Sequence, residues 1–85
     1  MQVLIPSALR SYTERSVVEA SGATLAAVLA DLERLYPGIR FRMINEQGRI
    51  RPHIRFFVDG EQARDLARRL DANGELVIVQ ALSGG

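Results

Sequence analysis

The segment from Thr24 to Gly38 constrains the fold more than any other part of this sequence. Its apolar residues recur at the spacing of one helical face, as Leu25, Val28, Leu29, Leu32, Leu35 and Tyr36. Thr24 is a good N-cap residue. Pro37 and Gly38 end the pattern, because the residue before proline leaves the α region and glycine accepts the angles that follow a helix. We therefore predict one amphipathic helix, over residues 24–36, whose apolar face belongs to the core.

Short apolar and β-branched runs on both sides of this helix predict strands. They lie at 2–5, where Pro6 stops the run, and at 16–20, 53–58 and 75–81. The first two are close in sequence and should pair as a hairpin. The run from Leu76 to Val79 is apolar on both faces, which suits a central strand.

Three other segments are less well defined by their patterns. Residues 39–44 alternate apolar and basic side chains, which fits either a strand or a short helical turn. Residues 7–15 are mostly polar and predict a loop. Within 62–72, Ala63, Leu66, Ala67 and Leu70 have helical spacing, which predicts a short helix.

A chain of 85 residues, 47% of them hydrophobic and 25% charged, has the size and composition of one globular domain. The order of elements predicts an α+β protein with one sheet and one main helix across it. We expect this domain to occupy residues 1–81, with residues 82–85 as a flexible tail.

Missing residue types exclude several kinds of chemistry. The chain has no Cys and no Lys, and its only histidine is His53. It therefore has no disulfide, thiolate nucleophile, Schiff-base lysine or P-loop lysine, and one histidine cannot form a closed metal site. A coding preference for arginine would also explain the lysine deficit. We expect a protein that is not an enzyme and that binds no metal.

Positive charge is concentrated in the middle of the chain. The net charge is only +1, yet residues 40–55 carry five arginines against Glu46, a local balance of +4. These are Arg40, Arg42, Arg49, Arg51 and Arg55. A solvated sheet edge explains such a cluster most simply, and a docking surface for an acidic partner is the functional alternative. Phe41, Phe56 and Phe57 could stack on bases, but the sequence has no RNP1-like run and the net charge is small, so no nucleic-acid partner is expected.

The hydropathy of the chain gives no sign of a membrane segment. The longest apolar stretch, residues 25–30, is far below the roughly 20 residues that span a bilayer. The first residues have no basic leader. We expect a soluble cytoplasmic protein without a membrane partner.

The sequence ends on two glycines, Gly84 and Gly85. Two such residues at a chosen place have a chance probability of roughly 0.5%, and a linker remnant would explain them simply. The functional interpretation is that glycines, which lack a Cβ, can thread a terminal carboxylate through a narrow channel into another protein's active site. Coupled to AMP, that carboxylate becomes an electrophile that sulfur or an amine can attack.

Several short motifs, in order along the chain, carry a family resemblance. They are Ile5-Pro6, Leu9-Arg10, Ala23-Thr24, Tyr36-Pro37-Gly38, Gly48-Arg49-Ile50-Arg51-Pro52, Phe57-Val58-Asp59-Gly60-Glu61, Asn73-Gly74-Glu75 and Ser83-Gly84-Gly85. In this order the chain resembles the ubiquitin-like sulfur carriers of the MoaD/ThiS family over nearly its whole length. The resemblance implies a β-grasp fold with a mixed sheet of four to five strands, in which the first and last strands pair in parallel.

The resemblance also implies a mechanism in which the chain is a co-substrate. An E1-like adenylyltransferase would use ATP and Mg²⁺ to adenylate Gly85, while Leu82, Ser83 and Gly84 thread into its active site. A sulfurtransferase or cysteine desulfurase would then supply the sulfur of a thiocarboxylate, and a downstream synthase would take it. A JAMM-type metallopeptidase is a further implied partner. No cofactor would stay bound to the chain itself.

The pathway that receives the sulfur stays open at this point. Leu9-Arg10 and Arg49-Ile50-Arg51-Pro52 look most like carriers of cysteine biosynthesis, followed by molybdopterin synthase small subunits and thiamine carriers. The lead-in Gln80-Ala81-Leu82-Ser83 departs from relatives, which more often have proline, valine and alanine there. The residues also fit a ubiquitin-like modifier that is conjugated to lysines, or a non-catalytic binding module.

Overall fold

The computed structural model of the chain describes residues 1–81, so the predicted tail at 82–85 lies outside the described residues. Along the chain, the elements are β1 (Gln2–Leu4), the 3-10 turn η1 (Ser7–Leu9), α1 (Arg10–Thr13), β2 (Val17–Glu19), α2 (Leu25–Leu35), α3 (Ile39–Met43), β3 (Ile54–Val58), β4 (Glu61–Ala63) and β5 (Glu75–Gln80). Within residues 1–81, no helix is long and apolar enough to cross a bilayer.

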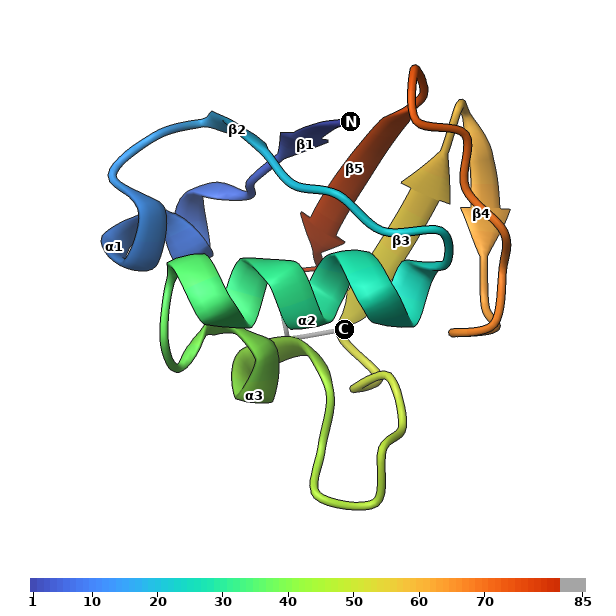
Figure 1. Cartoon of the computed structure of the whole chain (residues 1–85). Coiled ribbons are helices and arrows are strands. Elements are labelled where there is room, and N and C mark those ends of the chain that lie inside the picture. The colour runs from blue at the N-terminus through green and yellow to red at the C-terminus, as the bar shows by residue number, and fades with distance from the viewer. Residues whose placement is uncertain (82–85) are drawn as a thin grey trace.

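The strands form one mixed sheet in the order β2-β1-β5-β3-β4 (Figure 1). β1 and β2 are antiparallel, which confirms the predicted hairpin. β5 lies at the centre, as its apolar sequence predicted, and runs parallel to β1 with Val3 opposite Leu76. On its other side β5 is antiparallel to β3, and Phe56 lies opposite Ile78. The parallel pairing of the first and last strands matches the arrangement that the family resemblance implied.

α2 crosses one face of this sheet and supplies the core (Figure 1). Its N-cap is Thr24, whose hydroxyl accepts the backbone N–H of Ala27 at 3.2 Å, as the sequence predicted. Its helical face and the inward residues of the strands are fully or nearly fully buried, among them Leu25, Val28, Leu29 and Leu32 from α2 and Val3, Phe56, Leu76 and Ile78 from the sheet. The sheet and the helix therefore make a two-layer α+β domain.

Residues 39–43 form the short helix α3, which resolves the choice that the sequence left open. Ile39 and Met43 of α3 are buried, whereas Phe41 is exposed. In a strand, residues 39, 41 and 43 would share one face, so two buried residues with an exposed residue midway between them are typical of a helix. Gly38 begins this helix with a φ of 98° in the left-handed region, which favours glycine.

The short helix predicted within 62–72 is wrong. The structure instead has β4, which pairs antiparallel with β3, followed by turns. Leu66 and Leu70 do pack against the core, as their apolar character required, but from a turn and an isolated bridge between Arg69 and Thr24. Asp65 favours a turn here, because its carboxylate accepts the backbone N–H of Ala67 at 2.8 Å.

The loop predicted at 7–15 contains the short elements η1 and α1 instead. Leu9 and Thr13 are buried, and Glu14 ends α1 with a φ of 59°. The helical turns in this segment are too short to show a periodic apolar pattern. Its mostly polar composition therefore predicted a loop.

Candidate functional site

The described chain leaves the sheet at the end of β5. Gln80 pairs with Ile54, and the backbone N–H of Ala81 donates to the carbonyl oxygen of His53 at 2.7 Å. Gly85, Gly84, Ser83 and Leu82 lie beyond this point and outside the described residues. Their predicted roles therefore stay predictions, and the described surface around the end of β5 is the part of the site that can be examined.

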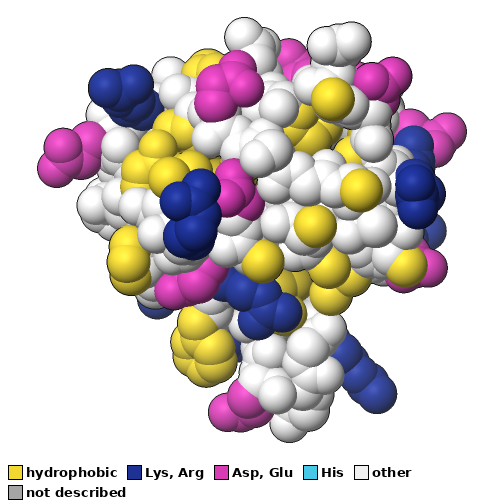
Figure 2. Space-filling model, viewed as in Figure 1, with side chains coloured by type: hydrophobic (Ala, Val, Ile, Leu, Met, Phe, Trp, Pro, Cys, Tyr) yellow, Lys and Arg dark blue, Asp and Glu magenta, His cyan; other side chains and the backbone are white. Residues whose placement is uncertain are grey.

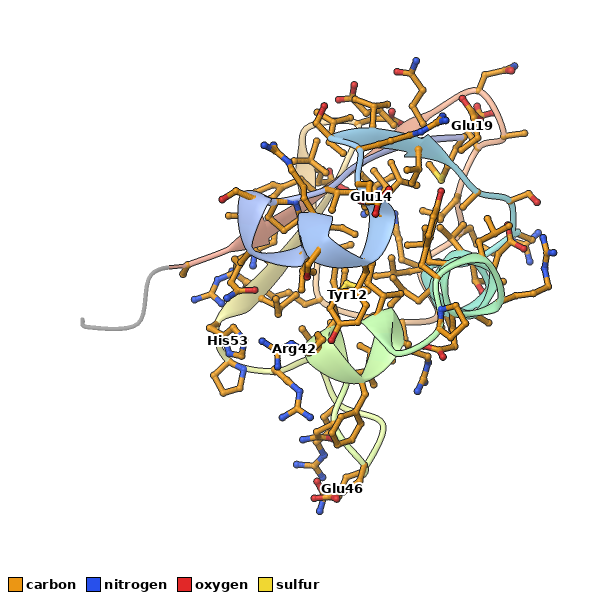
Figure 3. All side chains as sticks on the ribbon, turned by 90° about the vertical axis from the view of Figure 1, so that its left-hand side faces the viewer. Tyr12, Glu14, Glu19, Arg42, Glu46 and His53 are labelled. Carbon is orange, nitrogen blue, oxygen red and sulfur yellow. The ribbon has the colours of Figure 1, made fainter. Side chains whose placement is uncertain are left out.

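Two of the predicted arginines lie together beside this point. Arg42 and Arg51 line a shallow cavity of about 220 Å³ with Phe41 and His53. Figure 3 shows Arg42 and His53 as neighbours. Arg51 is held in place, since its guanidinium carbon lies 4.6 Å from the centroid of the Phe41 ring and its Nε donates to the Phe41 carbonyl at 2.8 Å.

A third predicted arginine extends this positive surface across the end of β3. Arg55 lines an adjoining hollow with Arg51 and Arg64. Its guanidinium donates to the carbonyl of Ile54 at 3.2 Å and also to that of Pro52. No acidic side chain lines either hollow within residues 1–81. We call Arg42, Arg51, Arg55 and Arg64 the basic cluster.

The other two predicted arginines are not part of the basic cluster. Arg40 lies against Glu33, whose carboxylate accepts the backbone N–H of Gly38 at 2.8 Å and that of Arg40 at 3.0 Å. The hydrogen bond from Gly38 and then that from Arg40 lower the pKa of Glu33. Arg49 lines a further hollow, which it shares with Arg64 and with Asp65. The five predicted arginines therefore line more than one part of the surface.

Sequence reasoning missed Arg64. It lies outside residues 40–55, in a segment that was predicted to be helical. The antiparallel pairing of β4 with β3 brings it to the same hollow as Arg55. An isolated arginine after a short strand gives no sequence signal for this placement.

An apolar surface on the open face of the sheet was also missed. Side chains alternate along a strand, so the neighbours of the buried residues point away from α2. These outward residues include Leu4, Val17, Phe57, Val77 and Val79, all half-buried or exposed. Register places Val77 between Leu4 and Phe57, and Val79 opposite Arg55. We call these five residues the outer face. Because Val79 lies opposite Arg55, the outer face adjoins the basic cluster.

The helix-covered side of the molecule is different. Figure 2 shows basic and acidic side chains interspersed there with small apolar patches. Asp31 and Arg34 on α2 form an ion pair at 2.8 Å. Asp31 also accepts the backbone N–H of Ser21, and this hydrogen bond followed by that from Arg34 lowers its pKa. Charges of both signs are thus locally compensated on this side.

The opposite end of the sheet is acidic. A hollow there is lined by Met1, Glu19, Asp59, Glu75 and their neighbours. The amino group of Met1 donates to the carbonyl of Ala20 at 2.7 Å and lies 3.5 Å from the Glu19 carboxylate. Among residues 1–81, no group of three or more His, Cys, Asp or Glu side chains could hold a metal ion.

A mixed sheet with β1 and β5 parallel at its centre, and one long helix across one face, defines a ubiquitin-like protein of the β-grasp class. The fold that the resemblance implied is therefore confirmed. The chain belongs to the ThiS family, whose family model matches residues 3–85.

Individual relatives agree with this assignment along the whole chain. The sulfur carrier protein CysO of Mycobacterium tuberculosis is 35% identical over 89 residues, which cover 98% of this chain and 96% of the relative. A chain in the crystal structure of the Amycolatopsis orientalis BexX/CysO complex has a TM-score of 0.91 at 32% identity, covering 99% of this chain and 98% of that one. SAMP1 of Haloferax volcanii has a TM-score of 0.81 at 26% identity, covering 100% and 98%.

Proposed function

We propose that this protein is a sulfur carrier whose cargo is held as a thiocarboxylate on Gly85. The observation that carries the proposal is the family match, which runs through Gly84 and Gly85 at the end of residues 3–85. The full-length likeness to a protein named as a sulfur carrier supports the same function. We place this carrier in the cytoplasm.

The chemistry begins at one carboxylate. A Gly85 carboxylate oxygen attacks the α-phosphorus of ATP, forms the acyl-adenylate and expels pyrophosphate. The outer sulfur of a donor persulfide then attacks the carbonyl carbon and expels AMP, which gives an acyl disulfide. A thiol of the donor or of the activating enzyme attacks the donor-side sulfur, forms a disulfide with it and releases the thiocarboxylate. ATP and Mg²⁺ belong to an E1-like adenylyltransferase, and the sulfur comes from a sulfurtransferase or cysteine desulfurase. The carrier contributes its carboxylate and its docking surface.

The surface next to Ala81 suits such a partner. Val79 and the rest of the outer face are apolar, and Arg55 lies directly opposite Val79. An apolar centre with a charged rim is the ordinary anatomy of a protein interface. A relative of this chain forms a complex with BexX, which supports a protein partner here as well. We assign the outer face to that contact, with Arg42 and Arg55 at its rim.

Intact-mass analysis of the protein from its native cell tests this function. The expected species carries sulfur in place of one carboxyl oxygen. A variant lacking Gly85 should fold with the same unfolding midpoint and should not be adenylated. The proposed function is wrong if the deletion variant still supports sulfur transfer. It is also wrong if the protein isolated from cells that produce it contains no species with sulfur in place of a carboxyl oxygen.

A ubiquitin-like modifier is the second candidate. The likeness to SAMP1, a small archaeal modifier protein, favours it. The activation step is the same, and the acceptor is a lysine of another protein. The same mass analysis separates the two functions, because conjugates appear as heavier species joined through Gly85.

The pathway that receives the sulfur is defined by the downstream enzyme that takes it from the carrier. We propose a synthase of cysteine biosynthesis, in line with the CysO relatives, and a JAMM-type metallopeptidase that releases the loaded product. A molybdopterin synthase large subunit or a thiamine synthase as partner would assign the carrier to those pathways instead. Incubating thiocarboxylated carrier with each purified candidate synthase, and following loss of the sulfur by mass, identifies the acceptor.

A further inference from the structure

Three hollows lie in succession beside the loop at 48–53 and share lining residues. The hollow of about 220 Å³ and the hollow of about 320 Å³ have Arg51 in common. The latter shares Ile50 and Arg64 with a third hollow, of about 630 Å³. Because each hollow adjoins the next at these residues, the three form one groove. We call it the basic groove.

Arginine supplies the positive charge of the basic groove, which is lined by the four residues of the basic cluster together with Arg49. Asp65 is the one acidic side chain along it within residues 1–81, and its carboxylate already accepts the backbone N–H of Ala67 at 2.8 Å. Among the same residues, Arg34 and Arg68 are ion-paired with carboxylates, whereas no arginine of the basic groove is. The groove therefore holds positive charge that the described part of the chain does not neutralise.

Neutral oxygen atoms hold three of these guanidinium groups in place. Arg51 donates through Nε to the carbonyl of Phe41 at 2.8 Å, and Arg64 donates to the side-chain amide oxygen of Gln62 at 3.1 Å. Arg55 donates to two backbone carbonyls near the start of β3. Each guanidinium has five N–H groups, so most of them stay available for a carboxylate. An incoming anion would not have to break an existing ion pair.

Aliphatic side chains also line the basic groove, from Ile50, Ile54, Ala63 and Leu66. We propose that the basic groove binds an extended acidic segment of a partner protein, in which carboxylates alternate with aliphatic side chains. Successive side chains of an extended segment point to opposite sides. One set can therefore reach the guanidinium groups while the other packs against the aliphatic lining.

Arg55 connects the basic groove to the outer face, because it lies opposite Val79. A partner that covers the outer face can therefore place an acidic segment in the groove as well. Carboxylates that meet guanidinium groups in this way raise the association rate and fix the orientation of the partner. The inference goes beyond the proposed function, since it holds for a protein partner of this chain whether or not Gly85 carries sulfur.

A nucleic acid and a free anion fit the basic groove less well. Single strands bind by stacking bases on aromatic rings, but the Phe41 ring at the groove already has the Arg51 guanidinium 4.6 Å from its centroid. The net charge of only +1 also gives little attraction for a polyanion. A single phosphate ion would contact the arginines of one hollow, whereas those of the basic groove are distributed over three.

The experiment titrates the full nitrogen-15-labelled chain and follows the arginine Nε–Hε signals by NMR. Because the chain has no lysine, these signals cover all its lysine-type and arginine-type charges. The probe is a synthetic octapeptide of alternating glutamate and valine, and its neutral counterpart has glutamine in place of glutamate. We expect the glutamate peptide to shift the signals of Arg51, Arg55 and Arg64 to saturation and to leave that of Arg34, on α2, unchanged. The glutamine peptide should shift none of them.

Arg64→Gln tests the site by substitution. The Arg64 side chain bonds only Gln62 within residues 1–81, so the fold does not depend on it. We expect about a fivefold loss of affinity for the glutamate peptide, the order of one exposed charge pair. Arg64→Lys should lose less, because lysine keeps the charge without the planar fork. Arg34→Gln is the matched control and should bind as wild type does, and equal thermal unfolding midpoints confirm that all four proteins are folded.

The inference is wrong if the glutamate peptide does not bind, or if it shifts the signals of all arginines alike. It is also wrong if octauridylate RNA binds more tightly than the peptide, or if inorganic phosphate at the same concentration produces the same shifts. The chain is used without ATP and without any modification of Gly85, so a negative result leaves the proposed function untouched. Conversely, absence of a native thiocarboxylate would refute the proposed function and leave this titration unchanged.

Discussion

Arg51 is bound twice to Phe41, through its guanidinium over the aromatic ring and through its Nε to the Phe41 carbonyl. The backbone N–H of Arg51 also donates to Met43 at 2.9 Å, and Ile44 forms an isolated bridge with Ile50. These contacts fasten the loop after α3 to α3 itself. One side of the cavity next to His53 is built on this connection.

Replacing Arg51 should therefore loosen the loop. We expect Arg51→Ala to lower the free energy of unfolding by about 1–2 kcal/mol, since it removes a partly exposed cation–π contact and one hydrogen bond. Urea denaturation measures this. Arg49→Ala is the matched control, because the Arg49 side chain makes no hydrogen bond or ion pair within residues 1–81. Equal midpoints for the two variants would contradict the role of Arg51.

Alanine substitutions at two glycines test steric crowding and backbone strain separately. A Cβ on Gly22 would lie 2.6 Å from the backbone nitrogen of Val28, whereas one on Gly60 would meet nothing within 4 Å but would stand at a φ of +85°. We expect Gly22→Ala to cost about 3 kcal/mol or more, as overpacking against rigid backbone does, and Gly60→Ala to cost about 1 kcal/mol. Thermal unfolding ranks them, and the reverse order would show that the close approach of Gly22 to α2 is not needed.

Glu33 should make stability depend on acid pH. Hydrogen bonds from Gly38 and Arg40 hold its pKa below the value in the unfolded chain, so its contribution is fully present above the unfolded pKa. That contribution is lost as the pH falls below about 4 and through the folded pKa. Glu33→Gln should therefore lose less stability than wild type between neutral and acid pH. Denaturant titrations at several pH values measure the slope, and equal slopes for Glu33→Gln and wild type would contradict this role of Glu33.

The outer face should matter for the partner and not for the fold. Val79 and Leu35 are comparably exposed, at 37% and 40%, but Val79 is on the outer face and Leu35 is at the end of α2. We expect Val79→Asn to reduce adenylation at limiting carrier concentration about tenfold, a typical loss at the centre of an interface. Leu35→Asn should leave it unchanged. Pyrophosphate release by the activating enzyme measures the adenylation rate of both variants. Equal rates would show that the partner contacts a surface other than the outer face.

How much could be predicted depended on how local each signal was. The capping residue Thr24 and the periodic leucines of α2 act within one segment, so the helix was predicted closely. Leu76 to Val79 correctly indicated a central strand, but an apolar run does not say whether both faces are covered. Val77 and Val79 in fact lie on the open face. The basic cluster depends on contacts between segments that are distant in sequence, so the run of arginines alone did not show which of them meet or that Arg64 lies beside Arg55.

β5 lies between β1 and β3 at the middle of the sheet, although it is the last strand in sequence order among residues 1–81. During synthesis, the earlier strands therefore wait without their central neighbour, and long-range pairing of this kind is slow to form. Leu4, Val77 and Phe57 become adjacent only when β5 enters the sheet. A partner that binds these three side chains together would consequently recognise the chain only after β5 has joined the sheet.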